Sequence, residues 1–140
     1  MFIRKQGKTK LMWLPVTTST ALSAGALVTF SSGKLIAATS TTVGSDIVGV
    51  LRHTIAATDA DYATARLVEV EVPVEKNVVW TADVTSGLVA ADIGLYQDLT
   101  DSLTVNRGAS TYDIAQCTKV LSATKGEFLL NIGVDARAKA

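Results

Sequence analysis

The sequence has very little of the chemistry that enzymes and metal proteins use. It contains one cysteine and one histidine in 140 residues, and aromatic residues make up 6%. Cys117 has no partner for an internal disulfide, and a Cys/His zinc site needs about four ligands. No glycine-rich phosphate loop and no dinucleotide-binding glycine pattern occurs. We therefore expect no enzyme activity, no catalytic residues, no metal site and no cofactor.

Charge and hydrophobic runs exclude two further classes of partner. Thirteen basic and thirteen acidic residues give a formal net charge of zero, whereas phosphate binding depends on a basic surplus. No apolar run approaches the roughly 18 residues that a membrane span requires. The apolar stretch Leu11–Leu14 ends at Pro15 and is too short for the core of a signal peptide. We expect no nucleic-acid partner, no membrane partner and no secretion signal.

The few titratable candidates are better explained as structural residues. His53 and Cys117 could in principle form a nucleophile–base pair, but both lie in strand-like runs without supporting context. Asp59 and Asp61 are spaced like calcium ligands, as are Asp98 and Asp101. Neither pair has the glycine and terminal glutamate of a calcium loop, so we interpret them as turn-forming residues.

Small and β-branched residues dominate what remains, and they favour strands over long helices. Short apolar runs separated by turn signals predict eight or nine strands, with one helical turn in 85–92 and a possible short one in 59–65. A hairpin is predicted for 26–38 around Ser32-Gly33, and another for 114–132. Gly49 indicates a bulge or a close backbone approach. The fold class is all-β, a compact β-sandwich or small β-barrel.

The stretch 66–74 alternates most clearly. It places the valines at 68, 70, 72 and 74 on one face, with Glu69 and Glu71 on the other. Period two predicts a half-buried strand whose glutamates face water, and Pro73 indicates an edge at the end of this strand.

Residues 1–16 differ from the rest of the chain. The first 45 residues carry five basic side chains and no acidic one, and four of the five precede Leu11. We expect an extended N-terminal arm (1–16) followed by a single β-domain (17–140). A flexible tail is the alternative, but clustered large apolar residues favour docking on an acidic partner. The predicted partner-binding residues are Arg4, Lys5, Lys8, Lys10, Leu11, Trp13 and Leu14.

Several short motifs resemble the head-decoration (cement) proteins of tailed bacteriophages. They are Leu22–Val28, Ser32–Leu35, Ala38-Thr39, Asp46–Val50 and Ala91–Tyr96, within a similarity that spans about 16–133. The resemblance implies a virion protein on the outer capsid surface, bound to the major capsid protein and forming a homotrimer. It carries over no catalytic residue.

Two other functions remain open at this point. One is a fibre or receptor-binding module of a virion, although no long repetitive shaft is present. The other is a small-ligand or carbohydrate-binding β-barrel, which calls for clustered exposed aromatics beside acidic or amide groups.

Overall fold

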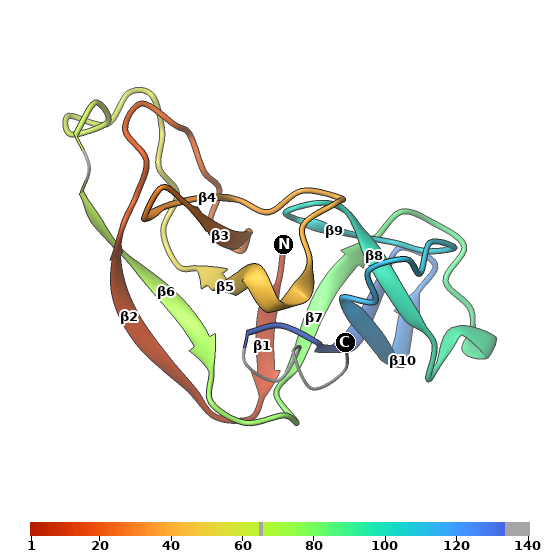
Figure 1. Cartoon of the computed structure of the whole chain (residues 1–140). Helices are drawn as coiled ribbons and strands as arrows, with labels where there is room; N and C mark the ends of the chain where they lie inside the picture. The colour runs from red at the N-terminus through yellow and green to blue at the C-terminus, as the bar shows by residue number, and fades with distance from the viewer. Residues whose placement is uncertain (65, 134–140) are drawn as a thin grey trace.

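The computed structural model describes residues 1–64 and 66–133, and it confirms the all-β prediction. The described residues form eleven strands in two sheets (Figure 1). The strands are β1 (Ile3–Gln6), β2 (Thr9–Pro15), β3 (Leu27–Ser31), β4 (Lys34–Ala37), β5 (Ile47–Leu51), β6 (Leu67–Pro73), β7 (Val79–Val84), β8 (Tyr96–Asp101), β9 (Thr104–Asn106), β10 (Ala115–Ser122) and β11 (Lys125–Leu130). Two short 3-10 turns, Gly44–Asp46 and Ala90–Asp92, are the helical elements in this part of the chain.

The six-stranded sheet has the order β1-β7-β11-β10-β8-β9, and β9 also pairs with β7 in parallel. This second pairing closes β7, β11, β10, β8 and β9 into a small barrel. Its core includes Trp80, Leu99, Val105 and Phe128, all at most 1% exposed. The closed ring leaves this half of the molecule with few open strand edges.

The five-stranded sheet has the order β2-β6-β5-β3-β4. A parallel bridge between Val16 and Leu35 brings its two ends together just beyond β2. A second apolar cluster, which includes Val28, Leu35, Leu51 and Val70, fills the space inside. In Figure 1, β2 and β6 lie side by side at one end of the molecule, and β8 and β10 lie at the other.

The predicted turn and bulge signals are confirmed. Ser32 and Gly33, both with positive φ (51° and 78°), connect β3 and β4 as a hairpin. At Gly49, a Cβ would lie 2.3 Å from the Glu71 carbonyl oxygen, so the backbone approach requires glycine. Pro73 lies beyond the end of the β5–β6 pairing, where β6 has no neighbour on that side. Between 85 and 92 the helical part is the turn Ala90–Asp92, and 59–64 form turns without a helix.

The N-terminal segment is not a separate arm, and the predicted boundary at residue 16 was wrong. β1 pairs with β7 in the six-stranded sheet, and β2 pairs with β6 in the five-stranded sheet. Phe2 is 2% exposed in the main core, and its N–H donates to the Gly25 carbonyl at 2.8 Å. The basic residues misled the prediction because all four are exposed although three of them belong to strands. Both sheets therefore include residues 1–16.

The strand predicted for 66–74 exists, but its two faces differ from the prediction. Val68 and Val70 are buried as expected, whereas Val72 is half-buried and Val74 is exposed. Glu71 is only 5% exposed, so its expected position in water was wrong. β1 passes close to this face of β6 and covers it, as the contacts of Glu71 with Arg4 show. The alternation of residue types in 66–74 predicted a strand, but it could not predict which other strands cover each of its faces.

Candidate docking surface

The structure distributes the seven predicted partner-binding residues over β1, the turn after it, and β2. Arg4 and Lys5 belong to β1, Lys8 lies in the turn, and Lys10, Leu11, Trp13 and Leu14 belong to β2. Gly7, at φ 102°, allows the sharp turn between the two strands. Because the strands enter different sheets, the seven side chains do not form one continuous site.

Two of the four predicted basic residues have partners inside the protein. The Arg4 Nε donates to Glu71 Oε2 at 2.5 Å, and the Lys5 Nζ donates to Glu127 Oε2 at 3.0 Å. Both carboxylates are largely buried, at 6% and 11% side-chain exposure. Arg4 and Lys5 therefore neutralise buried carboxylates, and their charges are engaged within the protein although their side chains are 41% and 49% exposed.

Lys8 and Lys10 are exposed and available to a partner. Among the described residues neither side chain forms an ion pair. They lie near the same end of β2, where the main chain of Lys8 meets β6 through the Val74 N–H. The Glu75 carboxylate lies at the same end and accepts the Lys8 N–H at 3.0 Å, so this end carries charges of both signs.

Side chains of β2 alternate between the two faces of the sheet. Leu11 and Trp13 point outward and are 49% and 60% exposed. Leu14 lies on the other face, is half-buried and packs against the inner apolar cluster, so its side chain does not belong to the outward-facing surface. Leu67, at the start of β6, is 59% exposed and joins the outward-facing pair through the β2–β6 register.

Two polar residues complete this surface. The rings of Trp13 and His53 stack with centroids 6.4 Å apart and an interplanar angle of 24°. His53 Nε2 lies 3.0 Å from Glu69 Oε1. We call Leu11, Trp13, His53, Leu67 and Glu69 the Trp13 patch. Sequence reasoning missed Leu67 and His53, although an apolar residue in line with Glu69 on the outward face was a usable signal.

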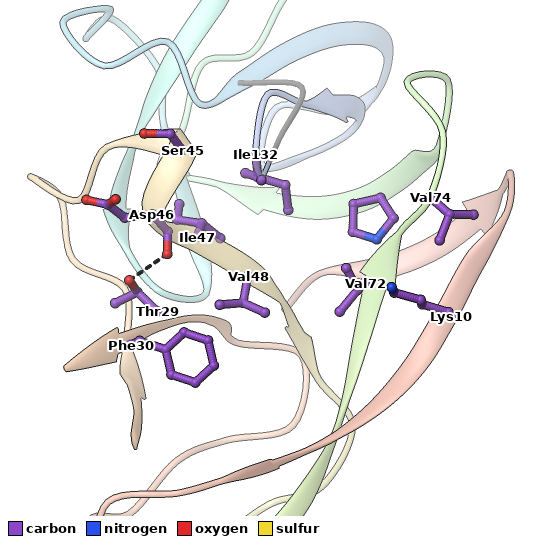
Figure 2. Close-up of a pocket in the computed structure, with 12 residues that line it drawn as sticks. Lys10, Thr29, Phe30, Ser45, Asp46, Ile47, Val48, Val72, Val74 and Ile132 are labelled. Atoms are coloured by element: carbon purple, nitrogen blue, oxygen red, sulfur yellow. Dashed lines mark hydrogen bonds between the residues drawn. The ribbon is translucent and has the colours of Figure 1, made fainter. Parts of the chain in front are cut away.

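A groove of about 620 Å³ opens beside this sheet, where β5 and β6 separate. Figure 2 shows Lys10, Val72 and Val74 along one wall and Phe30 and Val48 along the other. Its remaining lining residues are Thr29, Ser45, Asp46, Ile47, Pro73, Ile132 and Gly133. The groove is mainly apolar, and nothing in the sequence predicted it because its walls are far apart along the chain.

The two candidate reactive residues, Cys117 and His53, lie in different sheets and are engaged in contacts within the fold. Cys117 is buried in β10, and burial raises the pKa of its thiol, so the nucleophilic thiolate is disfavoured. His53 follows β5 in the other sheet and contacts Trp13 and Glu69. Within 1–64 and 66–133, no three His, Cys, Asp or Glu side chains are grouped to hold a metal ion.

The turn-forming interpretation is confirmed for Asp59, Asp61 and Asp101 but was wrong for Asp98. Asp59 accepts the Ala56 N–H, and both Asp59 and Asp61 bind the Arg66 guanidinium. Asp101 ends β8 and accepts the Leu103 N–H in the turn to β9. Asp98 lies within β8, and its carboxylate accepts three backbone N–H groups from the distant loop residues 111–113.

Asp92 holds a second loop in the same way. Its carboxylate accepts the Val89 N–H at 2.9 Å and the Arg107 Nε at 2.9 Å. The Val89 N–H and then the Arg107 charge lower the pKa of Asp92. The carboxylate therefore acts as an anchor for the loop between β7 and β8.

Comparison with known proteins does not identify a family for this chain. No family model matches the chain, and no curated protein matches it significantly. In the described residues no helix is long and apolar enough to cross a membrane.

Proposed function

We propose that this chain is a structural virion protein, a decoration (cement) protein that binds the outer surface of a capsid built from the major capsid protein. The observation that carries the proposal is the Trp13 patch, an exposed apolar surface on the outer face of β2 and β6. Lys8 precedes β2, and Lys10 lies near the start of the same strand with its side chain on the opposite face. Large aromatic side chains contribute much of the binding energy at protein interfaces. The resemblance to phage decoration proteins supplies the identity of the partner.

The two parts of the surface act differently in this proposal. Lys8 and Lys10 attract an acidic shell and fix the orientation of approach, an effect that salt screens. Trp13, Leu11 and Leu67 then lose contact with water and hold the complex. The homotrimer that the resemblance implies is part of the proposal, since several copies bound together attach to a repeating lattice more strongly than one.

Binding to shells that lack the protein tests this proposal. Trp13→Ala is compared with Leu95→Ala, because Leu95 is also apolar and 54% exposed but lies next to β8, at the opposite end of the molecule. We expect Trp13→Ala to weaken binding at least tenfold and Leu95→Ala to leave it unchanged. Replacing Lys8 and Lys10 by glutamine should reduce the dependence of binding on salt. Equal affinities for all variants would contradict the proposed surface, and no binding by the unmodified chain would contradict the function.

A further inference from the structure

β2 has an open edge along most of its length. It pairs with β6 from Thr9 to Pro15 and touches β4 only near its C-terminal end, through the bridge of Val16 with Leu35. Figure 1 shows β2 as the outermost strand at its end of the molecule. A strand with one free side carries unpaired N–H and C=O groups that can pair with another chain.

The backbone groups on this open side belong to Leu11 and Trp13. The Lys8 carbonyl accepts the Val74 N–H, and the Val16 N–H donates to the Arg66 carbonyl, so even-numbered residues of β2 point toward β6. Successive residues of an antiparallel strand direct their backbone groups to opposite sides. The N–H and C=O groups of Leu11 and Trp13 therefore point away from the sheet.

The middle of the edge lacks the features that normally prevent pairing. Natural proteins protect open edges with bulges, prolines, charged side chains or covering loops. Lys10 and Pro15 are features of this kind, but they stand near the two ends of the strand. Between them, Leu11–Leu14 carries no charge, and the register with β6 runs over seven residues without a bulge. A regular, apolar and uncovered edge of this length is suited to pairing.

We infer that β2 pairs with β2 of a second copy of this chain, in an antiparallel arrangement with Met12 on the two-fold axis. In this register Leu11 of one copy lies opposite Trp13 of the other, and the two residues exchange N–H···O=C bonds. Lys10 lies opposite Leu14 of the second copy, so no two lysines face each other. Shifting the register by two residues toward the N-terminus would bring the two Lys10 side chains closer, which like-charge repulsion disfavours.

This pairing also enlarges the surface assigned above. Leu11 and Trp13 of both copies would form one apolar stripe on the outer face, continuous with Leu67 on each side. Antiparallel pairs of aromatic and aliphatic residues stabilise such contacts. Strand pairing alone buries less area than a standard interface, so we expect a dimer that dissociates at micromolar concentrations. The inference does not rest on shell binding, and a three-fold contact would use a different surface.

Cysteine cross-linking of the full-length protein tests the register. In a Met12-centred pair the two Cα atoms at position 12 lie about 4.5 Å apart, within the range of a disulfide. Residues at position 14 lie four residues out of register, about 13 Å apart, which is too far. We expect Met12→Cys to form a covalent dimer under mild oxidation and Leu14→Cys to form none. Both variants also contain the native Cys117, which is buried, so any cross-linking through Cys117 would be the same in the two variants. Equal cross-linking of the two variants, or none in either, would overturn the inference.

Light scattering over a range of concentrations tests the edge itself, without shells. Leu11→Pro removes one outward N–H and leaves the β2–β6 bonds intact, whereas Leu11→Ala keeps that N–H. We expect Leu11→Pro to raise the dissociation constant of the dimer at least tenfold, and Leu11→Ala to raise it less. A strict monomer at all concentrations, or an oligomer that Leu11→Pro does not weaken, would overturn the pairing. Circular dichroism of both variants checks that they remain folded.

Discussion

Glu71 connects the two sheets, and its replacement provides a sharp test of the fold. Its side chain is 6% exposed and accepts hydrogen bonds from Arg4 of β1, Thr9 of β2 and Arg52 after β5. Arg4 belongs to the six-stranded sheet and Glu71 to the five-stranded one. The perturbation is Glu71→Gln, which keeps the shape but removes the charge and replaces one acceptor oxygen by a donor.

The expected magnitude follows from these contacts. A hydrogen bond to a charged group contributes about 1.5–3 kcal/mol, and the Arg4 and Thr9 contacts are the short ones, at 2.5 and 2.8 Å. The Arg52 contact is 3.4 Å and adds little. Arg4 is 41% exposed, so water screens part of its attraction. We expect Glu71→Gln to lower the free energy of unfolding by about 2 kcal/mol.

Urea unfolding followed by tryptophan fluorescence measures this change. The control is Glu69→Gln, two residues away on the same strand, whose His53 partner is 51% exposed. A surface pair of this kind contributes about 0.2–1 kcal/mol, less than the change expected for Glu71→Gln. If both substitutions change the free energy of unfolding equally, the carboxylate of Glu71 does not join the sheets and our reasoning fails.

Three further predictions follow from the close contacts and the pKa shifts. Gly49→Ala should lower the free energy of unfolding by about 1–3 kcal/mol in a urea titration, because its Cβ meets the Glu71 carbonyl; an unchanged midpoint would contradict the approach. Asp92→Asn should destabilise the protein at about pH 6 but hardly at about pH 2. The pKa of Asp92 is lowered in the fold, so its contribution is complete above 3.8 and is lost as the pH falls through the lowered pKa; a pH-independent difference in thermal unfolding would be inconsistent with this. Cys117 should react with a thiol reagent only after unfolding, and fast labelling of the native protein would show that the thiol is accessible.

Local signals in the sequence predicted local structure well. The Ser32-Gly33 turn, the close approach at Gly49 and the final hairpin all depend on residues near each other in the chain. Backbone sterics at such positions are dictated by one or two residues, so sequence alone suffices. The all-β class followed from the same signals.

Long-range pairings could not be predicted in this way. The N-terminal segment was interpreted as an arm because its charges hide the alternation of Leu11 and Trp13 with Met12 and Leu14. Its pairing partners, β7 and β6, lie more than 50 residues away along the chain. Removing residues 1–15 would take Phe2 from the core and a strand from each sheet, so we expect the shortened protein to lose its fold.

The candidate surface was predicted in part. Trp13 and Leu11 were found because large apolar residues were clustered beside lysines, and the structure exposes both. Arg4 and Lys5 could not be separated from Lys8 and Lys10 by sequence, since only the fold brings Glu71 and Glu127 to them. Charge pattern identifies a basic segment, but ion pairing across the fold decides which charges remain available.

Electron cryomicroscopy of shells incubated with the purified full-length protein tests the central claim most directly. Shells assembled from the major capsid protein alone and the same shells after incubation would be compared. The account predicts additional β-rich density at lattice positions on the outer surface, oriented so that the Trp13 patch faces the shell. Undecorated shells at saturating protein concentration, or density bound through the β8–β10 end, would contradict it.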